Sequence, residues 1–276
     1  MSTESTTETI AFIGGGNMAR SLISGLIGAG TDPERIMVSD PVAEQRALLL
    51  ELGIQVTDKN DEAVAQAGSM VVLAVKPQVL GDVLKSLEAL SPEQLLVSIA
   101  AGVPVAAMQA WTSVSQPIVR CMPNTPALLG AGMTALFASE AVSDRDRGRA
   151  EAVLETAGRT LWVNEESKLD AVTAVSGSGP AYFFYLMEAM IDSGISQGLD
   201  AETATVLTLE TAYGAALMAR ERSATPAVLR SNVTSPGGTT AAALAVLEAH
   251  DTAAIVRRAL DGARDRSQAL AVEFGA

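Results

Sequence analysis

The chain of 276 residues has one cysteine, one histidine, and 19 basic residues against 32 acidic ones. Cys121 alone cannot form an intrachain disulfide, and no multi-cysteine metal site, Cys–His pair or Ser–His–Asp arrangement can be assembled. The formal charge of −13 repels nucleic acids and anionic membranes, so we expect neither as a partner. Any anionic ligand must be held by helix N-termini and backbone N–H groups instead.

Long apolar runs are also lacking, since none approaches the roughly 20 residues that span a bilayer. Residues 1–9 contain no basic residue and no apolar stretch, so we expect a solvated tail there rather than a secretory signal. A lone cysteine fits a reducing compartment, and we expect a cytoplasmic protein. At about 150 residues per domain, the length indicates two domains.

In the first part of the chain, up to about residue 164, short β-branched runs alternate with amphipathic segments. This pattern is typical of a parallel sheet with crossover helices. The predicted strands are Ile10–Ile13, Ile36–Val38, Met70–Val75, Leu95–Ile99, Ile118–Met122, Met133–Ala138 and Thr160–Val163. The predicted helices are Met18–Ala29, Ala43–Leu52, Pro77–Leu90 and Asp144–Thr156. We expect a doubly wound α/β domain over residues 1–165, with the last two strands closing the sheet.

The strand pattern ends beyond Glu165, and residues 166–276 are expected to form an all-helical domain. The predicted helices are Lys168–Ala174, Pro180–Gln197, Ala201–Arg220, Pro226–Ser231, Thr239–His250 and Thr252–Phe274. Several are apolar around most of their circumference, more than a domain of this size can bury by itself. We therefore predict a homo-oligomer built through this half, the alternative being a well-filled monomer core.

A glycine-rich turn follows the first predicted strand: Gly14, Gly15 and Gly16 precede Asn17 and Met18 and satisfy the pattern G-x-G-x-x-A. Glycine permits a tight turn and a close backbone approach to a pyrophosphate, whose charge the following helix N-terminus attracts. The position between a strand and a helix favours a dinucleotide site over a simple turn.

The second predicted strand is followed by Ser39 and Asp40, where an acid would bind an adenosine ribose. Asp40 precedes a proline and equally fits a helix cap. Ser39 could face the ribose instead, with a basic residue nearby to neutralise a 2′-phosphate. Three basic residues are candidates for that role: Arg35, Arg46 and Lys59. The residues leave the choice between NADH and NADPH open.

Two further segments follow strands at the edge where ligands of open α/β sheets bind. The first, Ala74-Val75-Lys76-Pro77, places a lysine that could face the cofactor or be solvated. The second, Arg120–Pro126, supplies the amide of Asn124 in a proline-stiffened loop that suits a ligand cleft or a plain turn. Cys121 within it has no histidine partner and is expected to be structural.

The segment richest in candidate ligand-binding residues is Leu229–Thr240, which contains a Gly-Gly turn between two predicted helices. The N–H groups of Gly237, Gly238 and Thr239 open the second helix and could bind a carboxylate, with the Thr240 hydroxyl beside them. A structural turn and cap is the alternative. Ser176–Ala181 is expected to serve packing, and His250 to cap a helix.

Six segments together resemble the pyrroline-5-carboxylate reductase family, in that family's order and over nearly the whole chain from Ile10. The segments are Ile13–Met18, Ala74–Pro77, Ala100–Val103, Arg120–Pro126, Ser176–Ala181 and Val233–Thr240. The stretch Asn232–Thr240 matches the family signature, which is far more specific than a glycine-rich turn. The resemblance implies a Rossmann-like sheet domain, a helical dimerisation domain, and dimers that assemble further.

The resemblance also implies the last step of proline biosynthesis: NADP(H), with NAD(H) as the alternative, reduces the imine carbon of 1-pyrroline-5-carboxylate. By that resemblance Gly14–Met18 hold pyrophosphate, Asn60 the ribose, and Ala74–Pro77 the nicotinamide side. Ser39 and Asn124 are further cofactor candidates. The substrate candidates are Asn232, Val233, Thr234, Ser235, Gly237, Gly238, Thr239 and Thr240, with Thr240 as the catalytic candidate that bonds the ring nitrogen.

Two other functions remain open at this stage. A carboxylate cradle would equally suit a reductase of another small cyclic imino acid or of a 2-oxoacid. A nucleotide-binding regulator without turnover is also compatible with a Rossmann-like half, because fold alone does not establish function.

Overall fold

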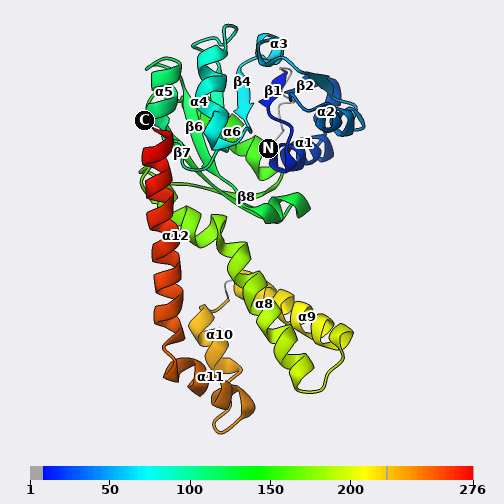
Figure 1. Cartoon of the computed structure of the whole chain (residues 1–276), viewed down its shortest axis with the longest axis vertical. Coiled ribbons are helices and arrows are strands. Elements are labelled where there is room, and N and C mark those ends of the chain that lie inside the picture. Colours follow the sequence, from blue (N-terminus) through cyan, green and yellow to red (C-terminus); the bar gives the residue numbers. More distant parts are fainter. Residues whose placement is uncertain (1–8, 222, 276) are drawn as a thin grey trace. The chain divides into compact units, whose positions relative to one another are not determined.

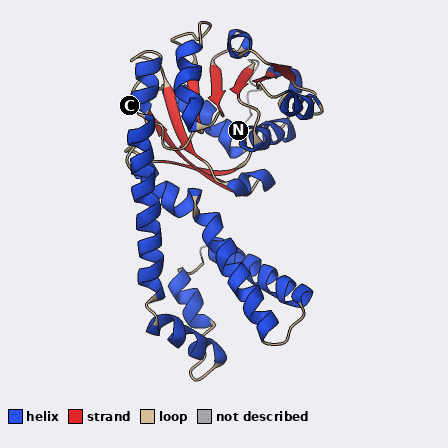
Figure 2. Ribbon diagram, in the orientation of Figure 1, coloured by secondary structure: helices blue, strands red, loops and turns tan. Residues whose placement is uncertain are grey.

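The computed structural model describes residues 9–221 and 223–275, so the predicted solvated tail lies almost entirely outside the described residues. A single eight-stranded sheet with helices on both faces dominates the first part of the chain (Figures 1 and 2). Its strands are β1 (Ile10–Ile13), β2 (Ile36–Ser39), β3 (Gln55–Thr57), β4 (Met70–Leu73), β5 (Leu95–Ser98), β6 (Ile118–Met122), β7 (Gly132–Ala138) and β8 (Gly158–Trp162). They lie in the order β3-β2-β1-β4-β5-β6-β7-β8.

Strand pairing confirms the doubly wound sheet. All neighbours run parallel except β6 and β7, which are antiparallel and make one departure from the expected parallel pattern. The strand order reverses between β1 and β4, because β2 pairs on one side of β1 and β4 on the other. Ile13 lies opposite both Ser39 and Leu73, so the carboxyl ends of these three strands share one edge, the usual ligand edge of such a sheet.

The core lies on both faces of the sheet. In β1, Ile10 and Phe12 pack into one buried apolar cluster, while Ala11 and Ile13 pack into the other. Helices α1 (Asn17–Gly28), α2 (Ala43–Leu50) and α6 (Asp144–Glu155) cover the first face, and α3 (Asn60–Gln66), α4 (Pro77–Ser86) and α5 (Val105–Trp111) the second. All four residues of β1 are buried, as expected for a parallel strand covered on both sides.

Three short strands and α-helices escaped the sequence prediction, β3, α3 and α5, as did two 3₁₀ turns, Pro33–Arg35 and Thr125–Leu129. Helix α4 also ends four residues earlier than predicted. Leu87 has an extended backbone, and the Asp61 carboxylate accepts hydrogen bonds from the N–H groups of Glu88 and Ala89 at 2.8 and 2.9 Å. A side chain from α3 thus satisfies donors that a longer helix would have used internally.

Beyond β8, the described residues are helical, as predicted. The elements are α7 (Lys168–Val172), a π-helical turn (Thr173–Gly177), α8 (Gly179–Ser196), α9 (Ala201–Arg220), α10 (Pro226–Asn232), α11 (Thr239–Ala249) and α12 (Thr252–Phe274). Two compact units emerge: one comprises the residues up to Ser178 and those from Ala263 on, and the other is Gly179–Gly262. The predicted domain boundary lies at residue 165. The compact units divide after Ser178 instead, because α7 packs against β7 of the sheet unit.

The second unit has little interior of its own. Helices α8 and α9 pack together, with Gly194 allowing close approach: a Cβ added there would lie 3.2 Å from the Ala204 Cβ. Among its described residues only Gly179, Ala204 and Thr208 are buried. Large apolar side chains such as Phe183 and Tyr185 are 65% and 75% exposed. A surface of this kind needs a partner to cover it.

Candidate functional site

The glycine-rich turn joins β1 to α1 at the shared edge of the sheet. Gly14 has a φ of +98°, and a Cβ there would lie 2.7 Å from the Ala74 carbonyl oxygen, so glycine is required. Gly16 is the N-cap of α1, whose N-terminus has no side-chain cap. A Cβ at Gly16 would meet nothing within 4 Å. The first N–H groups of α1 have no partner within the helix, and the exposed Gly16 lets a phosphate approach the backbone closely.

The remaining candidates at this edge follow β4. The Ala74 N–H donates to the Ile13 carbonyl at 2.8 Å, which continues the ladder past the end of β4. Lys76 is exposed and precedes α4, with Pro77 in that helix's first turn. Because β1 and β4 are neighbours, the segment Ala74–Pro77 and the turn Gly14–Met18 share one edge.

Two ribose candidates meet at the end of β2. The Ser39 hydroxyl donates to the Asn60 side-chain oxygen at 2.8 Å, and Asn60 begins α3. Ser39 is nearly fully buried at 1% exposure, whereas Asn60 is half-buried. The structure thus brings together two residues that are 21 positions apart in the sequence.

Asp40 follows β2 and is 8% exposed. One carboxylate oxygen accepts the Val42 N–H at 2.9 Å, and the other accepts the Gly15 N–H at 2.8 Å. The first bond is the local turn that the sequence allowed, and the second ties the end of β2 to the glycine-rich turn. Both oxygens are therefore engaged by backbone.

Asn124 fixes the loop after β6 in place. Its side-chain oxygen accepts the Met133 N–H at 2.9 Å, and its amide nitrogen donates to the Ser176 carbonyl at 3.1 Å. These bonds connect the loop to β7 and to the π-helical turn. Both ends of the amide form hydrogen bonds within the protein, so Asn124 has a structural role in holding this loop.

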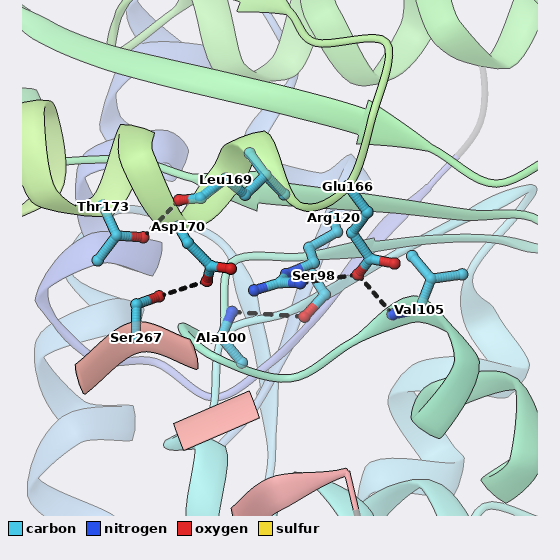
Figure 3. Close-up of polar contacts among 9 residues, drawn as sticks. All are labelled: Ser98, Ala100, Val105, Arg120, Glu166, Leu169, Asp170, Thr173 and Ser267. Atoms are coloured by element: carbon cyan, nitrogen blue, oxygen red, sulfur yellow. Dashed lines mark hydrogen bonds and ion pairs between the residues drawn. The ribbon is translucent and has the colours of Figure 1, made fainter. Parts of the chain in front are cut away.

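A polar cluster that the sequence did not predict lies beside β5 and β6 (Figure 3). Arg120, in β6, forms an ion pair with Glu166 at 2.7 Å, and the same Glu166 oxygen accepts the Val105 N–H at 2.8 Å. The Ser267 hydroxyl, on α12, donates to the Asp170 carboxylate at 2.7 Å. Glu166, just before α7, thus links α5 to β6, and Ser267 links the end of α12 to α7. The two pairs, Arg120–Glu166 and Asp170–Ser267, are 46 and 97 positions apart in the sequence, so no local sequence pattern indicates either contact.

The substrate candidates occupy one corner of the second unit, between α10 and α11. Asn232 ends α10 and Val233 follows it, while the Thr234 hydroxyl donates to the Arg230 carbonyl at 2.6 Å. Gly237 has a φ of +70°, and the Gly238 N–H donates to the Ser235 carbonyl at 3.0 Å. The turn thus directs the chain into α11 without using the helix's first N–H groups.

Helix α11 begins at Thr239 with Gly238 as its N-cap and without a side-chain cap. The N–H groups of its first turn have no partner within the helix, and their partial positive charge attracts a carboxylate. Thr240 is half-buried in that turn. The cofactor candidates thus lie in the first compact unit and the substrate candidates in the second.

Cys121 and His250 take the structural roles expected of them. Cys121 is buried in β6, and burial raises the pKa of its thiol far above the ordinary range. His250 follows α11 as its C-cap residue. Within residues 9–221 and 223–275, no group of three or more His, Cys, Asp or Glu side chains could hold a metal ion. None of the helices described is long and apolar enough to cross a membrane.

Comparison with known families matches both parts of the chain. The family model for pyrroline-5-carboxylate reductase dimerisation matches residues 166–270, and that for NADP oxidoreductase, coenzyme F420-dependent, matches residues 9–102. The chain is 52% identical to a pyrroline-5-carboxylate reductase of Pseudomonas aeruginosa, covering 98% of this chain and 99% of the relative. Identity to the Haemophilus influenzae enzyme of that name is 44%, covering 96% and 98%.

Solved structures agree along the whole length. A pyrroline-5-carboxylate reductase from Coxiella burnetii is 40% identical with a TM-score of 0.89, covering 96% of this chain and 99% of that one. A pyrroline carboxylate reductase from Plasmodium falciparum, solved with NADP bound, is 28% identical with a TM-score of 0.86, covering 96% and 98%.

Proposed function

The chain belongs to the pyrroline-5-carboxylate reductase family, and from this membership we propose the reaction and the residues that carry it. The protein reduces 1-pyrroline-5-carboxylate to L-proline with a nicotinamide coenzyme, the last step of proline biosynthesis. The observation that carries this function is 52% identity over 98% of the chain to a relative of that name. The match of residues 166–270 to the family's dimerisation model supports the same function, because a generic dinucleotide-binding protein would lack this helical half.

The sheet edge fits a dinucleotide coenzyme. We assign the pyrophosphate to Gly14–Met18, because Gly16 leaves open space beside the uncapped N-terminus of α1. Asn60 would hold the adenosine ribose, with Ser39 fixing its side-chain oxygen, and Ala74–Pro77 would face the nicotinamide side. NADP(H) is the assigned coenzyme, in line with the relative solved with NADP bound. When bound, the reduced coenzyme supplies a hydride. Asn124 would act on this site indirectly, through the loop that it fixes.

The corner Asn232–Thr240 is assigned to the substrate carboxylate. A protein with a charge of −13 needs a local positive device to bind an anion, and the first turn of α11 offers one. The Thr240 hydroxyl lies in that turn and would hydrogen-bond the ring nitrogen of the imine, orienting the carbon that accepts the hydride. A protonated imine is already electrophilic, so positioning by these groups is sufficient and a buried general acid is not required.

We propose that the two functional parts are residues 1–165 for the coenzyme and residues 166–276 for the substrate and the dimer contact. The family match that begins at residue 166 supports this boundary. The helical half is the dimerisation domain of the family, and the protein is a homodimer. We place the enzyme in the cytoplasm, in keeping with its single buried thiol.

The direct test is oxidation of NADPH or NADH, followed by absorbance, on addition of 1-pyrroline-5-carboxylate. We expect oxidation that depends on this substrate and forms proline. Other cyclic imino acids and 2-oxoacids, assayed in parallel, should give a much lower kcat/KM. Preference for one of them would replace the proposed substrate, and coenzyme binding without oxidation would make the protein a nucleotide-binding regulator.

A further inference from the structure

The end of β2 carries an acid, which in a dinucleotide site commonly binds the ribose 2′-hydroxyl and repels a 2′-phosphate. In this chain the acid is Asp40, and its surroundings argue against that role. Its two carboxylate oxygens accept N–H groups from Val42 and Gly15 at 2.9 and 2.8 Å, and the residue is 8% exposed. A carboxylate that is buried and accepts a backbone N–H at each oxygen is held against the protein and not presented to a ribose.

A cation is fixed at the same strand end. Arg46, on α2, donates from Nη1 to the Asp40 carbonyl oxygen at 2.7 Å and is half-buried. A guanidinium has five N–H donors in a planar fork, so one bond to a carbonyl leaves donors of the kind that phosphate oxygens accept. Arg35 is in contrast the last residue before β2, and hence lies at the opposite end of the strand.

Neighbouring groups also favour an anion here. Ser39 donates to the Asn60 oxygen, and this leaves the Asn60 amide nitrogen to donate. The nearby acids of α3 are engaged elsewhere: Asp61 accepts two N–H groups beyond α4, and Glu62 accepts the Thr57 hydroxyl. Lys59, exposed before α3, adds a second cation.

We propose that Asp40 is a positioning residue for the glycine-rich turn and that Arg46 binds the coenzyme 2′-phosphate, so that the enzyme prefers NADPH to NADH. This inference rests on the proposed function, because it assigns a specificity to the coenzyme site of that reaction. It also explains how an acid at the end of β2 is compatible with a phosphorylated ribose. The Asp40 carboxylate is held against the glycine-rich turn, and the Arg46 guanidinium, bonded to the Asp40 carbonyl, has donors left for the phosphate.

Binding of 2′,5′-ADP and of ADP, measured by calorimetry on the intact dimer, tests the assignment without turnover. Wild type should bind 2′,5′-ADP at least about tenfold more tightly, and Arg46→Gln should remove most of that ratio by weakening 2′,5′-ADP alone. Arg46→Lys should restore part of it. The matched control Arg35→Gln should keep the wild-type ratio. An unchanged ratio in Arg46→Gln, or equal binding of both nucleotides by wild type, would overturn the role of Arg46.

Asp40→Asn tests the positioning role. It should weaken NADPH and NADH by similar factors in a fluorescence titration, because both depend on the turn that Gly15 belongs to. Selective loss of NADH, or no loss for either coenzyme, would overturn the role. If Asp40→Asn does not fold, Arg46→Gln still decides the coenzyme preference. Should wild type bind 2′,5′-ADP selectively yet fail to reduce 1-pyrroline-5-carboxylate, the proposed function alone is refuted.

Discussion

Thr240 is a half-buried hydroxyl in the first turn of α11. If it orients the imine nitrogen, Thr240→Ala loses one hydrogen bond near the reacting centre. We expect kcat/KM for 1-pyrroline-5-carboxylate to fall by about 5- to 150-fold, which corresponds to about 1–3 kcal/mol, with circular dichroism unchanged. Thr205→Ala is the control, because the Thr205 hydroxyl donates to Ala201 within α9. Turnover as fast as wild type would remove Thr240 from the mechanism.

Cys121 gives the stability a dependence on alkaline pH. Burial raises the pKa of its thiol above the ordinary value of 9.0, so the folded chain keeps a proton that the unfolded chain releases. The stabilising effect is complete below pH 9 and is lost as the pH rises, by about 1.4 kcal/mol per unit. Denaturant titrations across this range should show the slope in wild type. Cys121→Ala should lack this part of the slope, and equal slopes would contradict the burial of the thiol.

At single residues, sequence reasoning located the candidates but not their partners. Asp40 was compatible with a ribose contact and with a local cap, and only the fold brings the Gly15 N–H to its second oxygen. The loop of Asn124 suited a ligand cleft or a plain turn, and the fold shows that both ends of its amide bond within the protein, to β7 and to the π-helical turn. Glu166 gave no signal, because its partner Arg120 is 46 positions away.

Among the elements, the turn between β1 and α1 offers a contrast between two glycines. A Cβ at Gly16 clashes with nothing in the protein but occupies the space proposed for the pyrophosphate. Gly16→Ala should therefore weaken NADPH binding by about 5- to 150-fold, while the free energy of unfolding changes by less than about 1 kcal/mol.

Gly28→Ala, at the last residue of the same helix, is the matched control for Gly16→Ala. It also meets nothing within 4 Å, and it should leave the NADPH affinity unchanged and stability equal or higher by about 0.4–1 kcal/mol. Fluorescence titration and denaturant unfolding of both variants give these numbers. Equal NADPH affinity in Gly16→Ala and wild type would place the pyrophosphate elsewhere.

Element prediction succeeded where the pattern was long or bounded by clear signals. The strands Ile10–Ile13 and Ile118–Met122 and the helix Ala201–Arg220 begin and end where predicted. The helices and strands that were missed, β3, α3 and α5, have only three to seven residues and span too few turns or alternations to show a period. The early end of α4 depends on the carboxylate of Asp61, which no local pattern of α4 contains.

For the whole molecule, the exposed apolar helices of the second unit require a partner chain. Light scattering at micromolar concentration should give twice the 28.5 kDa of one chain, or a multiple of that dimer. Replacing Phe183 and Phe184, which are 65% and 61% exposed, by Glu should shift the mass toward the monomer. The control replaces Leu50 and Val114, exposed on the sheet unit, and should keep the wild-type mass. A wild-type monomer would contradict the dimer.

The central claim is that the first turn of α1 holds the coenzyme pyrophosphate and the first turn of α11 holds the substrate carboxylate. A crystal structure of the dimer with NADP⁺ and proline measures both contacts at once. We predict pyrophosphate oxygens within hydrogen-bonding distance of the N–H groups from Gly16 to Met18, and the proline carboxylate within that distance of the N–H groups of Thr239 and Thr240. Either ligand bound at other residues in every subunit would contradict the account.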